Sequence, residues 1–253
     1  MPRGIPKAGF RVTKTRMMQA AEELKPSLFS VSERFDFIGQ FISMIGKKQT
    51  NSLILTGDPG LGKSYSVVKN LEKLGLKEIV LDNKGDFIVI KGFSTPRYLY
   101  ETLYNYNGKV IIFDDADDVH KDDRGSNLLK AALDNGKRIL NWGKRTSEDD
   151  TIPTRFEFTG RCIFISNLSI KQFPQALLSR SYCVDLTLTT QEKLDRINMV
   201  IHDYPGKTKE VMAFFIENAH DFKDVSIRSA LSVLKLANSI SDWKKLALYS
   251  MTV

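Results

Sequence analysis

The sequence is poor in the residues that cross-link a fold or hold a structural metal. Only two of its 253 residues are cysteine, Cys162 and Cys183, and only three are histidine. The histidines, His120, His202 and His220, are scattered and show no metal-ligand spacing. This composition argues against a disulfide framework and against a structural zinc site. Both cysteines fall in predicted strands, where we expect them to be small buried apolar residues.

Long apolar stretches are absent as well. No run approaches the roughly 18 residues that a membrane-spanning helix needs. The N-terminus also lacks the apolar core of a signal peptide. We therefore expect a cytoplasmic protein with no membrane partner. Its length allows one large domain, or one domain with a smaller companion, and a substantial core.

Acidic residues are missing from the first 20 positions. These positions carry +5 of the net charge of +7, so the other 233 residues carry only +2. We expect residues 1–28 to form a basic arm. Basic arms often bind nucleic-acid phosphates, although a solubilising tail or a strap on a neighbouring subunit has the same composition. The five cations are Arg3, Lys7, Arg11, Lys14 and Arg16.

The most informative pattern that the sequence does contain is G-x-x-x-x-G-K-S at residues 57–64. An apolar run at 53–55 precedes it, as a strand would. A helical pattern follows, with Val67, Leu71 and Leu74 at i, i+4 and i+7. This strand–loop–helix context predicts a phosphate-binding P-loop.

Each part of this motif has a phosphate-binding role. Glycines let the backbone wrap a phosphate without side-chain clashes, and the loop amides and helix N-terminus point at the anion. We expect Lys63 to reach the β- and γ-phosphates and the Ser64 hydroxyl to bind Mg²⁺. The predicted ATP-binding residues here are Gly57, Asp58, Pro59, Gly60, Leu61, Gly62, Lys63, Ser64 and Tyr65.

A second pattern is the apolar run at 110–113 that ends in Asp114 and Asp115. Buried parallel strands read as continuous apolar runs, and ligands gather at the carboxyl ends of such strands. We expect Asp114 to hold Mg²⁺ through water and Asp115 to polarise the attacking water. The alternative is a solvated acidic turn, because Asp117 and Asp118 follow directly.

The remaining elements alternate up to about residue 188 and are helical beyond it. This alternation predicts a parallel sheet covered by helices on both faces. We expect an α/β domain at 29–187 and a helical lid at 188–253. Predicted strands are 53–55, 87–90, 109–114, 162–165 and 182–186; predicted helices are 37–46, 67–74, 96–104 and 127–133. The lid is expected to bury three stripes: Leu194, Ile197 and Ile201; Val211, Phe214 and Phe215; and Ile227, Ala230, Leu231 and Leu234.

The chain resembles the AAA+ ATPases over nearly its whole length after the arm. The strand Ile163–Ile165 ends in Ser166 and Asn167, which resembles sensor 1. The segment 175–180 resembles the one that supplies an arginine finger, and Ser226, Ile227 and Arg228 resemble sensor 2. Ser226 is expected to be a helix N-cap. Each pattern has an ordinary alternative: a turn-forming Asn, a surface arginine and a tolerated first-turn cation.

The resemblance implies a fold, a chemistry and an assembly. The fold is α/β: an AAA+ three-layer αβα domain with a parallel sheet, followed by a small all-helical lid. The implied cofactors are ATP and Mg²⁺, and the implied assembly is a homo-oligomeric ring in which the finger enters the next subunit. The implied catalytic residues are Lys63, Asp115, Asn167, Arg180 and Arg228. Ile38 and Gly39 resemble the segment that packs near the adenine.

One departure and one looser likeness accompany this resemblance. The family usually has Glu where this chain has Asp115, which is one methylene shorter, so hydrolysis is expected to be slow or to depend on a partner. The compact pattern, without added domains, resembles ATPases of phage replication or morphogenesis. A phage-encoded protein of this kind would work in the host cytoplasm.

Two segments bear on what such an ATPase acts on. Residues 137–145 place four cations around Trp142, which suits single-stranded nucleic acid but also suits a strand with solvated flanks. Phe93 follows the second strand, where it either grips a substrate or joins the core. We expect ATP-driven remodelling or translocation of DNA, as by a helicase loader or DNA motor; the alternative is a protein-remodelling chaperone. A small-molecule P-loop kinase is a third interpretation, against which the finger segment and the lid argue.

Overall fold

The computed structural model describes residues 27–81, 84–92, 95–120, 122–143 and 151–253. Its centre is a five-stranded parallel sheet with the order β2-β3-β6-β1-β7. All six residues of β1 and all five of β3 and of β6 are buried, because helices cover both faces of these central strands. The strands are β1 (Ser52–Gly57), β2 (Phe87–Lys91), β3 (Val110–Asp114), β6 (Arg161–Ile165) and β7 (Tyr182–Leu186).

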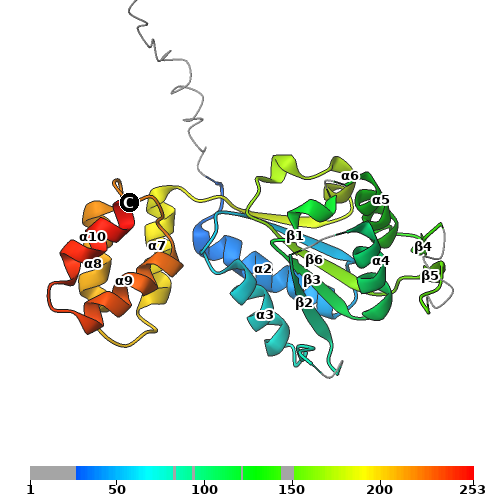
Figure 1. Ribbon diagram of the computed structural model, residues 1–253, viewed down its shortest axis with the longest axis horizontal. Helices are drawn as coiled ribbons and strands as arrows, with labels where there is room; N and C mark the ends of the chain where they lie inside the picture. Colours follow the sequence, from blue (N-terminus) through cyan, green and yellow to red (C-terminus); the bar gives the residue numbers. More distant parts are fainter. Residues whose placement is uncertain (1–26, 82–83, 93–94, 121, 144–150) are drawn as a thin grey trace, which may run out of the picture.

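Helices form the two outer layers, and alternate residues of β1 point to each of them. Leu53 and Leu55 pack in the cluster beneath α2 (Val31–Gly46) and α3 (Lys63–Lys73). Ile54 packs in the other cluster, with α4 (Pro96–Asn105), α5 (Asp123–Ala132) and α6 (Gln175–Leu178). Figure 1 shows this three-layer arrangement. The predicted α/β class with a parallel sheet and three αβα layers is confirmed.

Three helices differ from their predicted bounds for local reasons. α5 begins at Asp123 rather than 127, because the Asp122 side chain accepts hydrogen bonds from the amides of Arg124 and Gly125. α2 begins at Val31 rather than 37, because Ser30 and Glu33 form a capping box that satisfies the first amides. α3 ends at Lys73, so Leu74 is the C-cap and is 42% exposed instead of completing the apolar stripe. The stripe of α3 therefore consists of Val67 and Leu71 only.

A two-stranded antiparallel hairpin lies between α5 and β6. It pairs β4 (Ile139–Asn141) with β5 (Arg155–Glu157). From the sequence, residues 137–145 suited either a basic nucleic-acid contact or a strand with solvated flanks; the pairing with β5 was not predicted, because each strand is only three residues long. Two short 3₁₀ turns, η1 (Asp117–His120) and η2 (Ile170–Gln172), follow β3 and β6.

The C-terminal helices pack around a core of their own. They are α7 (Thr190–Ile201), α8 (Thr208–Asn218), α9 (Ile227–Ser239) and α10 (Trp243–Thr252). The three expected stripes are buried or partly buried in this core. α10 was not predicted; Trp243, Ala247 and Met251 of this helix complete the cluster. We call α7–α10 the helical lid.

The two cysteines differ in exposure. Cys162 is buried in β6, and burial raises the pKa of its thiol to about 12. Cys183 lies in β7, as expected, but it is exposed, because β7 is an edge strand whose outer face is only partly covered. The expectation of two buried cysteines is therefore wrong for Cys183. Among the described residues there is no cluster of three potential metal-binding His, Cys, Asp or Glu side chains. In the same part of the chain, no helix has the length and apolar character to cross a membrane.

Candidate nucleotide site

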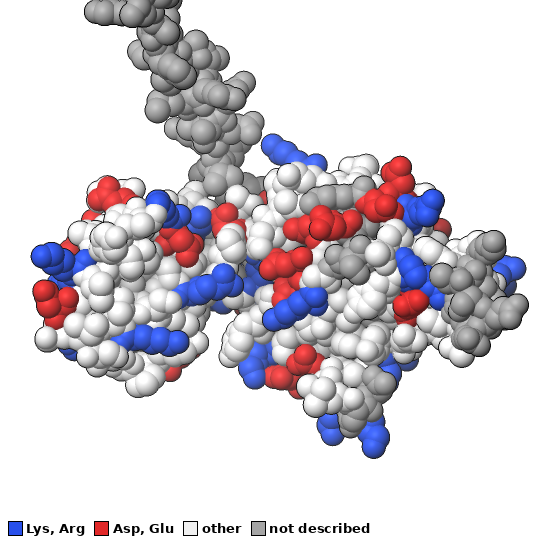
Figure 2. Space-filling view, in the orientation of Figure 1, with Lys and Arg blue, Asp and Glu red and all other residues white. Residues whose placement is uncertain are grey.

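The carboxyl ends of β1, β3 and β6 meet at one edge of the sheet. Because these three strands are neighbours, the residues that follow them converge. They border a cavity of about 370 Å³ that the start of α9 closes from the lid side. Figure 2 shows the hollow between the lid and the α/β domain. The cavity is lined by Pro59, Gly60, Gly62, Lys63, Ser64, Tyr65, Asp114, Asp115, Ile165, Asn167, Ile227, Arg228 and Leu231.

The P-loop backbone requires glycine at two places for steric reasons. Gly57 has a φ of +126°, and a Cβ there would lie 2.3 Å from the backbone carbon of Leu186 in β7. Gly60 has a φ of +72°, and its Cβ would lie 2.8 Å from the Ser226 side chain. L side chains rarely adopt such φ values, so the motif's glycines allow both the loop's curvature and its close contact with the lid.

Lys63 is held inside the loop. Its Nζ donates hydrogen bonds to the carbonyl oxygens of Gly57 and Asp58, each at 2.7 Å, and to Asn167 Oδ1 at 2.9 Å. Burial lowers the pKa of Lys63, while the surrounding carboxylates of Asp115, Asp58 and Asp114 oppose that shift. The lysine is thus a partly desolvated cation that lines the cavity.

Ser64 and Asp114 form an oxygen pair beside this lysine. The Ser64 Oγ donates to Asp114 Oδ1 at 2.8 Å, and Asp114 is buried at the end of β3. Magnesium binds oxygen ligands at about 2.0–2.1 Å in octahedral geometry and usually keeps several waters. One hydroxyl and one carboxylate, with room in the cavity for water, fit that preference.

Asp115 has an unusual backbone conformation and directly follows Asp114 of the Ser64–Asp114 pair. Its φ is +54°, a left-handed value that Asp tolerates better than most residues. Its amide donates to the Ile165 carbonyl at 3.0 Å, which ties β3 to β6 at this edge. Desolvation, and after it the Asp114 carboxylate, raises the pKa of Asp115. A raised pKa makes this carboxylate a better proton acceptor.

Asn167 connects Lys63 to Asp115. Its Oδ1 accepts from the lysine, while its Nδ2 donates to Asp115 Oδ1 at 2.8 Å. An amide has one accepting and one donating end, so a cation on one side and a carboxylate on the other fix its orientation. The structure therefore brings Lys63, Ser64, Asp114, Asp115 and Asn167 together, as predicted from three separate stretches of sequence.

The lid contributes Arg228 through the start of α9. Ser226 is the N-cap, as expected, in a capping box with Ser229. The Ile227 amide donates to the Gly60 carbonyl at 3.0 Å, so the lid contacts the P-loop directly. Arg228 is exposed and lines the cavity, where its charge opposes the rise in the pKa of Asp115.

Arg180 does not line the cavity that contains the P-loop. It borders a separate polar cavity of about 530 Å³, together with Lys48, Thr50 and Asn135. Its Nη1 donates to the Ala176 carbonyl at 2.8 Å, and its buried Nε has no acceptor among the residues that the structure describes. The structure does not bring Arg180 to the P-loop cavity of its own chain, and action on a neighbouring subunit stays a prediction.

Ile38 and Gly39 do not reach the cavity either. Ile38 has no exposed surface and belongs to the core under α2. A Cβ on Gly39 would lie 3.2 Å from Asn70 of α3, so this glycine serves helix packing. The residues of α2 that do contact the P-loop region are Val31 and Phe35, which pack against Leu61 and Leu188.

Helix α7 supplies residues that the sequence reasoning missed. Lys193 Nζ lies 2.9 Å from Asp58 Oδ2 of the P-loop, and Arg34 of α2 pairs with Glu192. The Arg196 guanidinium lies 3.7 Å from the centre of the Phe35 ring. These contacts depend on how α7 docks against α2 and the P-loop. The one signal in the sequence was the spacing of residues 192, 193 and 196, which places three charges on one helical face.

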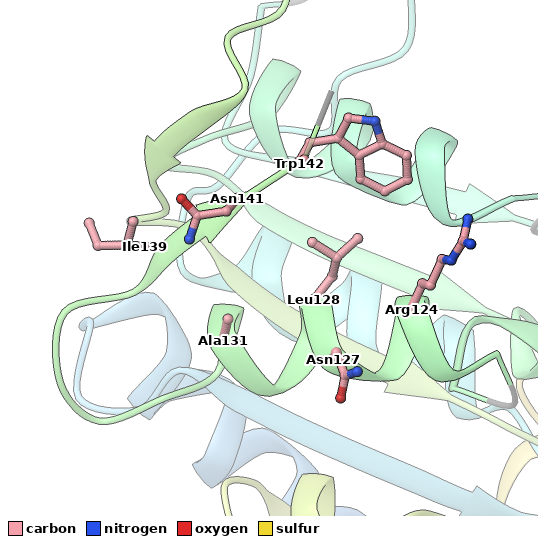
Figure 3. A pocket seen from close by; sticks show the side chains of 8 residues that line it. Arg124, Asn127, Leu128, Ala131, Ile139, Asn141 and Trp142 are labelled. Atoms are coloured by element: carbon pink, nitrogen blue, oxygen red, sulfur yellow. The ribbon is translucent and has the colours of Figure 1, made fainter. Parts of the chain in front are cut away.

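Trp142 borders the largest of these cavities, about 590 Å³, between α5 and β4. Figure 3 shows the indole across from Leu128. Arg124 lies at one end of the cavity and Ile139 at the other. Trp142 is partly buried against Tyr100, with ring centres 5.5 Å apart. Residues 139–141 thus form a strand, as in the alternative interpretation, while Trp142 still faces an open cavity. Lys144, Arg145 and Phe93 lie outside the described residues.

The sheet domain and the lid together define the fold. The three-layer sheet domain with its following helices has the AAA+ fold, and one similar solved structure is NtrX from Brucella abortus in complex with ATP. The TM-score is 0.53 at 14% identity, over 88% of this chain and 54% of NtrX, so the chain spans about half the length of that protein. No model of a known protein family matches the chain.

A relative places the chain within a family. It is 31% identical over 243 residues to an uncharacterised 36.7 kDa protein from the nrdC–mobD intergenic region of Enterobacteria phage T4. The match covers 86% of this chain and 73% of the phage protein. The chain belongs to the family of that phage T4 protein.

Proposed function

We propose that this protein is an oligomeric AAA+ ATPase that couples Mg²⁺-dependent ATP hydrolysis to remodelling or translocation of DNA. The observation that carries the ATPase part is the linked set Lys63–Asn167–Asp115 beside Ser64–Asp114 in one cavity. The likeness of fold to NtrX, solved with ATP, supports the choice of nucleotide. A chance arrangement would not link a P-loop lysine to an acidic strand end through one oriented amide.

The residues divide the work of phosphoryl transfer among them. The loop amides and Lys63 bind the phosphates. Ser64 and Asp114 would hold Mg²⁺, which supplies positive charge against the phosphate oxygens when bound. Asp115 accepts a proton from the attacking water, and Asn167 fixes the orientation of that carboxylate. Arg228 adds positive charge from the lid side of the cavity.

Arg180 gives the reason for proposing an oligomer. It lies apart from its own chain's cavity, and its buried Nε lacks an acceptor among the described residues. A neighbouring subunit's γ-phosphate would provide one in a ring. An arginine supplied in this way accelerates phosphoryl transfer by about 10³ to 10⁵ in related systems.

The cavity beside Trp142 favours DNA as the substrate. An indole, the Arg124 guanidinium and the amides of Asn127 and Asn141 surround an apolar floor. Aromatic stacking with nearby cations is how proteins hold single strands. On the face that Figure 2 shows, basic and acidic side chains are interspersed. The proposed contacts with DNA are the region around Trp142 and the basic arm, whose five cations are read from the sequence.

A protein substrate is the second candidate, and the surface of the lid favours it. Met199, Ile216 and Tyr249 are 51%, 62% and 67% exposed. Large exposed apolar side chains on one small helical unit suit a protein partner. A protein-remodelling ATPase of the same fold would use them.

ATPase measurements with different activators separate the two candidates. We expect single-stranded oligonucleotides to stimulate hydrolysis and to bind with an affinity that falls as salt rises. Duplex DNA of equal length, and an unfolded protein such as reduced casein, serve as comparisons. Stimulation by the protein but by neither form of DNA would transfer the proposal to protein remodelling.

A further inference from the structure

Arg196 stands out among the charged residues on the face of α7 that packs against α2 and the P-loop. Its neighbours on this face are paired: Glu192 with Arg34 of α2, and Lys193 with Asp58 of the P-loop. Within the described part of the chain, Arg196 has no carboxylate partner, and its buried Nε has no acceptor. It is a half-buried cation without an anion.

The guanidinium is directed at the phosphate-binding loop. Its Nη2 lies 3.7 Å from where a Cβ on Gly62 would be, and Gly62 is the residue before Lys63. On its other side, it stacks on Phe35 at 3.7 Å from the ring centre. Figure 1 shows α7 beside the beginning of α2. Burial lowers the pKa of Arg196, as expected where solvent and counter-charge are both reduced.

An unpaired cation that is partly removed from water destabilises the fold unless an anion binds it. The Phe35 ring offsets part of that penalty, because cation–π contacts favour Arg on an aromatic face. It does not satisfy the guanidinium N–H groups, which are planar donors suited to phosphate. An anion bound beside Gly62 would satisfy them.

We propose that Arg196 binds the phosphate chain of the nucleotide, at the part that ATP and ADP share. This assignment rests on the proposed ATPase function. It gives the lid two cations with different roles. Arg228 lines the cavity together with Asp114 and Asp115, whereas Arg196 is not among the lining residues and lies beside Gly62. The lid thus detects any nucleotide through Arg196 and the γ-phosphate through Arg228.

Two arginine variants test this division. Their ATP and ADP affinities are measured by calorimetry, with the melting temperature of each protein recorded without nucleotide. Losing a charge-assisted hydrogen bond weakens binding by about 10- to 100-fold. We expect Arg196→Gln to lose that much affinity for ATP and ADP alike. Arg228→Gln should lose affinity mainly for ATP.

The melting temperature distinguishes ligand binding from a structural role. If Arg196 binds nucleotide, Arg196→Gln should melt no lower than the parent, because the substitution removes an unpaired cation. If Arg196 only joins α7 to α2 through Phe35, the variant should melt lower and bind both nucleotides normally per folded molecule. That outcome would overturn the proposal.

Phe35→Leu is the matched control. It removes the aromatic ring and keeps the guanidinium, so ADP affinity should stay within about threefold of the parent. An equal loss of ADP affinity in Phe35→Leu and Arg196→Gln would assign the effect to packing. Loss of ATP affinity alone in Arg196→Gln would move the residue to the γ-phosphate end and contradict this assignment. A parent protein that binds neither nucleotide would instead contradict the proposed function itself.

Discussion

Two regions of the molecule position the proposed functional residues in different ways: the carboxyl edge of the sheet, and the borders between structural units. At the edge, Asn167 makes hydrogen bonds to both Lys63 and Asp115, and each of the three residues follows a central strand. At the borders, Arg180 and Arg228 are partly or fully exposed and make no hydrogen bond or ion pair to those three in the described structure. Strand order therefore brings the proposed catalytic residues together within one chain, while the positions of the two arginines depend on how separate units dock.

Arg180→Ala tests the residues at the borders between units, and it has the largest expected effect on ATP hydrolysis. We expect ATP binding to persist and hydrolysis to fall by about 10³-fold or more, because the charge that develops in phosphoryl transfer is no longer neutralised. The measurement is steady-state turnover at saturating ATP. Mixing with Lys63→Ala should restore some activity, since mixed interfaces regain an intact site. Mixtures that demonstrably co-assemble yet show no rescue would count against a shared site.

Two aspartate variants test the residues at the carboxyl edge of the sheet, and we expect a somewhat smaller loss of ATP hydrolysis. Asp115→Asn should bind ATP normally and lose turnover by about 10²- to 10⁴-fold, because the amide cannot accept the proton. Asp114→Ala should remove the response of hydrolysis to Mg²⁺, because the buried carboxylate beside Ser64 is lost. Full hydrolysis by Asp115→Asn would move the base to Asp117 or Asp118.

The acid side of the pH profile refines that test. Since the pKa of Asp115 is raised, its carboxylate is protonated at a higher pH than an ordinary aspartate. When the pH is lowered, hydrolysis should therefore begin to fall at a pH above about 3.9, the pKa of an ordinary aspartate. The profile of kcat at saturating ATP measures this. An acid limb at or below that value would mean that Asp115 does not limit the reaction.

Substituting each of the two tryptophans compares the proposed DNA-binding surface around Trp142 with the core of the helical lid around Trp243. Trp142→Ala should weaken single-strand binding by about 1–3 kcal/mol per stacked base, with little change in the salt dependence. Trp243, only 2% exposed in the lid core, is the control. Trp243→Ala should lower stability by about 3–5 kcal/mol and leave DNA affinity per folded molecule unchanged. If Trp142→Ala behaves like Trp243→Ala, the indole has a packing role only.

Deleting residues 1–20 should have the smallest effect at moderate salt. Five cations and no acids make the contribution of this segment to DNA binding mainly electrostatic. For every phosphate that the shortened protein no longer neutralises, the slope of log affinity against log salt should fall by about 0.7 for single strands. A titration of oligonucleotide affinity against salt measures this. An unchanged slope would assign the arm a role other than DNA binding.

The sequence predicted the edge of the sheet well for a physical reason. Buried parallel strands leave continuous apolar runs, and their ends must converge, so 53–55, 110–113 and 162–165 located the P-loop, Asp114 and Asn167. The β4–β5 hairpin escaped because three-residue strands leave no period. α10 lacked a recognised stripe, and Cys183 was misplaced because exposure at an edge strand is set by neighbours. Arg196 and Phe35 could not be found, since their meeting depends on lid docking.

ATP binding by Lys63→Ala tests the central claim most directly, because this lysine connects the P-loop to Asn167 and through it to Asp115. Calorimetry with ATP and Mg²⁺ compares the parent, Lys63→Ala and Lys69→Ala, a control on the exposed face of the same helix where Lys69 pairs with Glu72. The account predicts tight binding by the parent and by Lys69→Ala, and a loss of about 100-fold or more in Lys63→Ala. An affinity of Lys63→Ala within twofold of the parent would contradict it.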